Sequence, residues 1–170
     1  MKIKRFNYNR KKSTVEIEYE GIPIVPTDKA HVSFEAKDRP VSELVMLLDQ
    51  LRPHVETICS MPKDYCKDAE VRSISFSYKN NILGAVITVL VDLDSTNSPL
   101  LINTPYLPAE HIDDDSDAPL LPEACVELLE SILEGIEEYI KGKRAPKDQT
   151  ELEFPKEPVT ENPEDDDTKD

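Results

Sequence analysis

The chain has 170 residues, a formal net charge of -15 and 38% hydrophobic residues. This length and hydrophobic content predict one domain with a core of its own. The acidity disfavours general affinity for nucleic-acid backbones, since such binding requires a positive surface. It favours a basic protein surface as partner, or serves only solubility.

The charge is unevenly distributed along the chain. Residues 1–12 contain six basic residues and no acidic one, so the acidic excess lies entirely in the remainder. The three cysteines are an odd number, and no apolar signal segment follows the charged N-terminus, so we expect a reduced, cytoplasmic protein. The longest apolar stretch, residues 81–93, is too short to span a membrane.

Alternating apolar and polar residues predict strands in the N-terminal part of the chain. Val15, Ile17 and Tyr19 alternate with glutamates, which is typical of a strand with one face in water. Residues 3–8 are expected to pair with this strand as a hairpin. Residues 32–36 alternate in the same way and predict the next strand.

An amphipathic helix is predicted over residues 41–59, because apolar residues recur there with the helical period of 3.6. Pro53 should kink this helix, since proline lacks a backbone N–H and clashes with the preceding turn. Two further strands are expected at residues 73–78 and 85–93, joined by a two-asparagine turn. The second is apolar on both faces and is therefore the expected middle of the sheet.

The predicted domain ends in a long helix. Residues 100–107 are expected to add one edge strand, because the prolines around it are tolerated at sheet edges but not in the middle. After an acidic loop, Pro122 and Glu123 begin a helix whose apolar stripe runs to Ile140. Gly142 is the expected C-terminal cap.

Together these elements predict an α+β fold, with an antiparallel sheet of about five to six strands and two amphipathic helices in one domain at residues 1–145. Both halves have the order strand, strand, strand, helix, which fits either a duplicated unit or a coincidence. Residues 146–170 are acidic and rich in proline, with only Leu152, Phe154 and Val159 as apolar side chains. This composition predicts a disordered tail.

No catalytic residue, cofactor site or metal site is predicted. The acidic run from Asp113 begins like a calcium loop, but Ala118 stands where glycine is needed, so a solvated loop fits better. His54, Cys59 and Cys66 lack the paired spacing of zinc ligands. Because Cys59 continues the apolar stripe of its helix, a buried thiol is the better interpretation.

Two groups of residues are candidate partner-binding sites. The first is an acidic surface that either meets a basic protein or is an ordinary solvated face. Its members are Asp113, Asp114, Asp115, Asp117, Glu127, Glu130, Glu134 and Glu138. The second lies in the tail, where Gln149, Leu152 and Phe154 have the spacing of peptides that dock on the bacterial sliding clamp, or form an incidental apolar spot.

The basic residues 1–12 offer one more alternative. With Phe6 and Tyr8 as stacking surfaces, they could form a small nucleic-acid patch. Against this, Lys11 and Lys12 lie in the predicted hairpin turn, where lysines often serve only solubility and the protection of a sheet edge. Direct nucleic-acid binding is therefore not expected.

Several short stretches resemble a group of small uncharacterised proteins of phages and prophages. They are LRPH at residues 51–54, SYKN at 77–80, GAVIT at 84–88, NSPL at 97–100, INTP at 102–105 and GKRA at 142–145. The resemblance covers residues 40–145 and transfers no catalytic motif. It implies an association with phage replication and recombination.

The leading functional hypothesis is a non-enzymatic accessory protein of a phage or other mobile element that binds a protein of DNA replication or recombination. The alternative is an acidic nucleic-acid mimic that inhibits a DNA-binding host defence protein. A third hypothesis is an enzyme of unknown type. No cofactor and no membrane association are expected, and the oligomeric state is left open.

Overall fold

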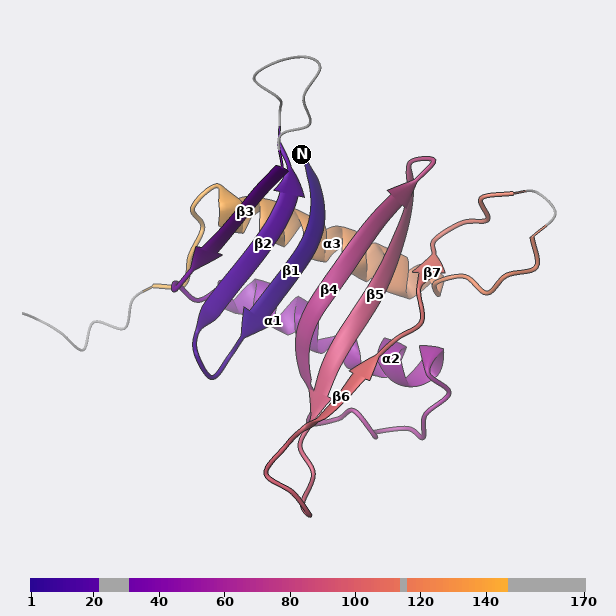
Figure 1. Cartoon of the computed structure of the whole chain (residues 1–170), viewed down its shortest axis with the longest axis horizontal. Coiled ribbons are helices and arrows are strands. Elements are labelled where there is room, and N and C mark those ends of the chain that lie inside the picture. Colours follow the sequence, from indigo (N-terminus) through magenta and orange to yellow (C-terminus); the bar gives the residue numbers. More distant parts are fainter. Residues whose placement is uncertain (22–30, 114–115, 147–170) are drawn as a thin grey trace, which may run out of the picture.

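The structure, a computed structural model, describes residues 1–21, 31–113 and 116–146. Within these residues, six strands form one antiparallel sheet in the order β3-β2-β1-β4-β5-β6, and a short seventh strand, β7, pairs with β5 (Figure 1). The strands are β1 (Lys2–Asn9), β2 (Thr14–Glu20), β3 (His31–Ala36), β4 (Glu70–Lys79), β5 (Ile82–Val91), β6 (Leu100–Asn103) and β7 (Leu107–Pro108). The helices are α1 (Ser42–Asp49), α2 (Arg52–Ile58) and α3 (Glu123–Ile140). The predicted α+β fold with an antiparallel sheet is confirmed.

The order of the sheet is symmetric about its central pair, β1 and β4. Phe6 of β1 lies opposite Ile74 of β4, and the following strands are added outward on either side. α1 and α2 follow β3, and α3 follows β7. Apart from β7, the two halves share the order strand, strand, strand, helix. That this order arose by duplication stays a prediction.

The helices lie on one face of the sheet, and the opposite face is open (Figure 1). Strand side chains that point toward the helices are buried, including Ile17 of β2 and Ile87 of β5, neither of which has exposed surface. α3 packs its apolar stripe into this core and contacts α1, where Gly135 lies against Leu44. Burial of apolar surface is the main stabilising term of such a fold. It also determines which side of α3 meets water.

Local signals end several elements where the sequence predicts. Asn80 and Asn81 both have positive φ and form the two-residue turn between β4 and β5. Gly142, with a φ of 107°, follows the end of α3. The backbone N–H groups of Gly142 and Lys143 donate to the carbonyls of Tyr139 and Glu138. These bonds make a Schellman motif, which satisfies carbonyls that the helix leaves free.

The prediction of one kinked helix over residues 41–59 is wrong in detail, because this segment forms two helices, α1 and α2. Pro53 lies in the first turn of α2. In a continuous helix its missing N–H would have bonded to the carbonyl of Asp49. The break therefore falls at Gln50 and Leu51, before the proline rather than at it.

Two further expectations about the sheet are corrected. Residues 100–107 do not form one strand, since β6 ends at Asn103, before Pro105, and β7 is separate. β5 is not the middle of the sheet, because β1 and β4 form the central pair. On the open face of β5, Leu90 lies opposite Leu101 of β6, so the two apolar side chains form a cross-strand pair.

Candidate functional sites: an acidic helix face and a basic hollow

The outward face of α3 carries a row of carboxylates, which we call the acidic row. Glu127, Glu130, Glu134 and Glu138 are exposed, and their spacing of three or four residues places them along one side of the helix. The other side is buried, for example at Ile132, which has no exposed surface. The structure therefore holds these four predicted residues together on a fixed support.

In the part of the chain that the structure describes, ion pairs of α3 are confined to its C-terminal end. Glu137 lies 3.9 Å from Lys141, and Glu138 accepts a 2.7 Å hydrogen bond from Lys143. This hydrogen bond and the charge of Lys143 lower the pKa of Glu138, so its carboxylate stays ionised to lower pH than usual. The other three carboxylates of the row face solvent.

The remaining predicted site residues do not join this row. Asp113 and Asp117 are exposed in the loop that precedes α3, beyond the N-terminal end of the helix. Outside the described residues lie Asp114, Asp115, Gln149, Leu152 and Phe154.

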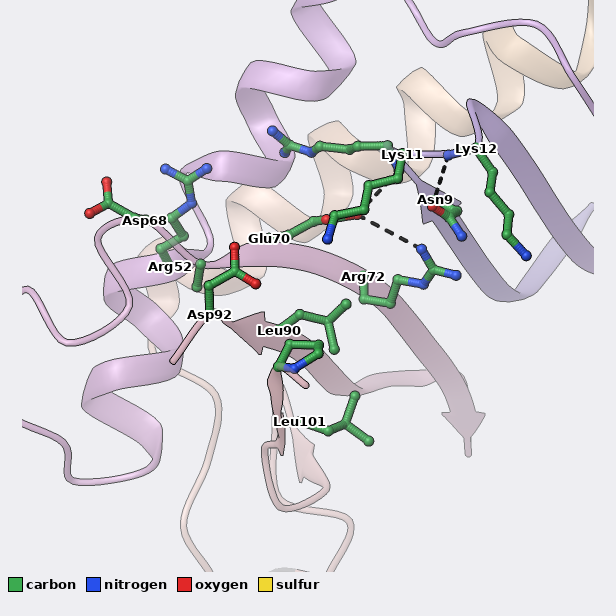
Figure 2. Close-up of a pocket in the computed structure, with 13 residues that line it drawn as sticks. Asn9, Lys11, Lys12, Arg52, Asp68, Glu70, Arg72, Leu90, Asp92 and Leu101 are labelled. Atoms are coloured by element: carbon green, nitrogen blue, oxygen red, sulfur yellow. Dashed lines mark hydrogen bonds and ion pairs between the residues drawn. The ribbon is translucent and has the colours of Figure 1, made fainter. Parts of the chain in front are cut away.

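A second candidate site is a hollow of about 540 Å³ at the end of the sheet where the β1–β2 turn meets the start of β4 (Figure 2). We call it the basic hollow. Its basic side chains are Arg10, Lys11, Lys12, Arg52 and Arg72, and its carboxylates are Asp68, Glu70 and Asp92. Five basic side chains meet these three carboxylates and Asp49, which pairs with Arg10 and Arg52, so the hollow keeps an excess of one positive charge in a chain of net charge -15.

Two carboxylates hold the arginines of the basic hollow. The Asp49 carboxylate accepts hydrogen bonds from the guanidinium groups of Arg10 and Arg52, the latter at 2.7 Å. Glu70 Oε1 accepts the backbone N–H of Arg10 at 3.2 Å and lies 3.8 Å from Nη1 of Arg72. Charge-assisted bonds of this kind fix side-chain geometry. They tie the β1–β2 turn to the helices and to β4.

The lysines of the basic hollow are free by contrast. Lys11 and Lys12 are exposed, and within the described ranges neither ammonium group has an ion pair. The floor beside them is apolar and includes Leu90 and Leu101, the latter 55% exposed. Figure 2 shows Lys11, Lys12 and Arg72 on one side of this floor. A basic rim beside an apolar floor suits a ligand that carries both anionic and apolar groups.

The expectation that Phe6 and Tyr8 offer stacking surfaces is wrong. They are 1% and 5% exposed, because both point toward the helices and belong to the core. Lys11 and Lys12 do lie in the hairpin turn, as predicted. The basic N-terminal segment therefore presents charge without aromatic faces.

The sequence reasoning missed the arginines that join the turn, Arg52 and Arg72. Arg72 sits at an irregularity in the β4–β5 register, between Val71 and Ser73. A bulge redirects the side chain of its extra residue, here toward the hollow. The available signal was a lone arginine beside an otherwise alternating strand pattern.

Cysteine and histidine chemistry is the third possibility. Among the described residues, no group of three or more His, Cys, Asp and Glu side chains could hold a metal ion. Cys66 and Cys125 have no exposed surface, and Cys59 is half-buried. Burial raises the pKa of all three thiols, that of Cys125 to about 11. They are therefore protonated near neutral pH, which makes them weak nucleophiles.

No family model, no curated protein and no solved structure matches this chain. Of the helices that the structure describes, none combines the length and the apolar character needed to cross a membrane.

Proposed function

We propose that this chain is a non-enzymatic accessory protein of a phage or other mobile element, and that it binds a protein of DNA replication or recombination. The observation that supports the proposal is the acidic row, exposed on a helix whose other side is anchored in the core. Proteins that bind DNA present positive surfaces, to which such a row is complementary. The phage context comes from the sequence resemblance.

The geometry of the acidic row favours recognition by charge. Its carboxylates are already aligned by the helix, so little backbone order has to be gained on binding. Exposed charges at the rim of an interface mainly accelerate association and make it sensitive to salt. We expect binding through this row to weaken steeply as ionic strength rises.

The tail residues Gln149, Leu152 and Phe154 are proposed as a secondary tether to a sliding clamp. A peptide with two apolar anchors can fill a preformed groove, and tethering beside a first contact raises the effective concentration of the second. Changing Leu152 and Phe154 to Ala should then abolish clamp recovery and leave the contact made by α3 intact.

A nucleic-acid mimic is the second candidate, because the carboxylates of the acidic row are evenly spaced. With a rise of about 1.5 Å per residue, Glu127 to Glu138 spans about 16 Å, or one charge per roughly 5.5 Å. A DNA strand carries one charge per about 3.4 Å. The row therefore has roughly two-thirds of that density, which favours a protein contact over imitation of DNA.

The acidic row is tested with the variant E127Q/E130Q/E134Q, which keeps helix-forming side chains and removes charge. Recovery of an identified replication or recombination protein from a nuclease-treated bacterial host lysate should fall about tenfold, as expected when three rim charges each contribute about 0.5 kcal/mol. The readout is quantitative mass spectrometry of the captured proteins. Equal melting temperatures of variant and wild type show that the fold is retained.

The matched control makes the same charge change elsewhere. E35Q/D94N/E110Q alters three exposed carboxylates outside α3 and should leave recovery unchanged. Equal losses in both variants, or no reproducible capture by wild type at low salt, would contradict the proposal. Displacement of the captured protein by double-stranded DNA would support the mimic instead.

A further inference from the structure

We propose that the acidic tail of this chain binds in its own basic hollow, with Leu152 and Phe154 on the apolar floor and Glu151 and Glu153 at the basic rim. The contact is intramolecular and does not depend on the proposed partner. In this contact the basic hollow is a binding site for an anionic peptide with apolar side chains, and the tail of the same chain is its occupant.

The described chain ends beside the rim of the basic hollow. The backbone N–H of Ala145 donates to the carbonyl of Arg39 at 3.0 Å, and Nε of Arg39 donates to the hydroxyl of Ser13 at 3.1 Å. Ser13 belongs to the same turn as Lys11 and Lys12. Two hydrogen bonds, through Arg39 and Ser13, thus connect the start of the tail to the turn that carries the lysines. A further 24 residues of the chain follow the described part.

The tail is long enough for its apolar residues to reach the floor. Adjacent strands lie about 4.8 Å apart, so crossing from the end of β3, which leads into Arg39, takes about 19 Å to β5 and about 24 Å to β6. The six residues from Pro146 to Leu152 span about 20 Å when extended, and Phe154 extends this to about 27 Å. Leu152 can thus reach Leu90 of β5, and Phe154 can reach Leu101 of β6.

The floor and the tail are complementary in their apolar groups. Leu101 is 55% exposed and lies opposite Leu90 on the open face of the sheet. Leu152 and Phe154 point to the same side of an extended chain, because side chains alternate along it. A hollow of about 540 Å³ is within the range of binding pockets, so two side chains can enter it.

The rim and the tail are complementary in charge. Glu151 and Glu153 alternate with the apolar residues and so point away from the floor. The ammonium groups of Lys11 and Lys12 have no ion pair in the described part of the chain and are free to meet them. In Figure 2 the carboxylates Asp68 and Asp92 lie on the side opposite Lys12, with Asp92 beside Leu90 of the floor. Their position favours an orientation with the tail acids toward the lysines.

Tethering makes a weak contact sufficient. A short flexible connection gives an effective concentration in the millimolar range, so an intrinsic dissociation constant of about 1 mM occupies the hollow to about half. While the tail is bound, Leu152 and Phe154 are not available to another protein. A partner for these residues must therefore compete with the hollow, and salt should assist it by weakening the charged contacts.

The experiment is amide NMR of the full chain in wild type, L152A/F154A and the matched tail control V159A. Docking predicts that the amides of Lys12, Arg72 and Leu101 move in L152A/F154A and not in V159A. Raising the salt from 50 mM to 500 mM should move the wild-type signals in the same direction. Absence of shifts at these three amides in L152A/F154A would overturn the proposal.

A second variant tests the rim. K11E/K12E should weaken docking about tenfold, since two favourable charges become unfavourable, and should lower the heteronuclear NOE of residues 151–154 to that of residues 160–170. K79E/K141E changes the net charge equally away from the hollow and should leave that NOE as in wild type. Equal effects of both variants would overturn the proposal. Shifts that vanish on dilution would also overturn it, because the occupant would then be the tail of a second copy.

Discussion

At the scale of single residues, Gly84 shows how a missing side chain supports the open face. A Cβ at this position would clash with the ring and the hydroxyl of Tyr106. The Tyr106 ring therefore packs directly on the backbone of β5. Since Tyr106 is 42% exposed, its ring can move into solvent when a Cβ is added at Gly84. The free-energy cost of that Cβ is then the lost packing of the ring and not strain in the core.

We predict that Gly84→Ala destabilises the protein by about 1 kcal/mol, because overpacking outweighs the gain in backbone entropy. In the background Tyr106→Ala the same change should stabilise by about 0.5–1 kcal/mol, since only the entropy term remains. Urea unfolding of the four proteins measures both values. An equal effect of Gly84→Ala in the two backgrounds would show that Tyr106 is not the obstacle.

The buried thiol of Cys125 makes a second residue-level prediction, for alkaline pH. Burial raises its pKa from 9.0 to about 11, so the folded protein keeps this proton after the unfolded chain has lost it. The stabilising contribution of the neutral thiol is complete below pH 9 and is lost as the pH rises through about 11. The rise from 9.0 to about 11 corresponds to about 3 kcal/mol across the whole window, of which about 2 kcal/mol is lost by pH 11.

The measurement compares wild type with Cys125→Ala between pH 8 and pH 11, because groups common to both cancel in the difference. The variant is less stable at pH 8 owing to the cavity it leaves. Its deficit should shrink by about 2 kcal/mol at pH 11. A deficit that stays constant across the range would contradict burial of the thiol as the cause.

At the scale of elements, Asp49 joins the end of α1 to the β1–β2 turn and to α2. Its side chain and those of Arg10 and Arg52 are each less than one-third exposed. Asp49→Asn keeps the size and leaves both guanidinium groups without a carboxylate, which should cost about 1–2 kcal/mol in thermal or urea unfolding. Lys141→Gln breaks an exposed pair and should cost less than about 0.5 kcal/mol. Equal losses of stability in Asp49→Asn and Lys141→Gln would contradict a stabilising role for the partial burial of the Asp49 ion pairs.

Elements with local signals could be predicted from the sequence, whereas contacts between distant elements could not. The Asn80–Asn81 turn and the Gly142 cap follow from the backbone preferences of their own residues. The predicted kink at Pro53 was misplaced, because proline removes the hydrogen bond to the carbonyl four residues earlier and the helix therefore breaks before it. The apolar period predicts a helix and the proline predicts that it is interrupted. The position of the interruption depends on which backbone hydrogen bond is lost.

The same distinction between local signals and distant contacts applies to the two candidate sites. The acidic row could be predicted because it depends only on the period of α3 and on which side is apolar. The basic hollow could not, because it requires β1 to pair with β4 and so brings together Arg10 and Glu70, which are 60 residues apart. Period-two patterns state that a strand exists and which face is buried, but they leave its neighbour undetermined.

At the scale of the whole molecule, charge is separated between the two layers. The acidic row lies on the exposed side of α3 in the helix layer, and the basic hollow lies at one end of the sheet (Figure 2). With the tail in the hollow, Lys11 and Lys12 would be covered and the acidic row would stay accessible. A basic partner would then meet one predominant charge, which favours a single orientation of approach.

The symmetric order of the sheet leads to a last prediction, on cooperativity. The halves meet at β1 and β4, where Phe6 lies opposite Ile74, and again where α1 contacts α3. We therefore expect one unfolding unit. Ile74→Val removes one methylene from a fully buried side chain and should lower the opening free energy of amides in β2 and in β5 by the same amount, about 1 kcal/mol.

Native-state hydrogen exchange measures these opening free energies strand by strand. Because Ile74 belongs to the second half, an effect on β2 must pass through contacts between the halves, which include the central pair, α1 against β4 and α1 against α3. A matched change at the sheet periphery, Ile82→Val, should have a smaller effect, since that side chain is only partly buried. If Ile74→Val lowered protection in β5 and left β2 unchanged, the two halves would open independently, and the central pair would be a boundary rather than a joint.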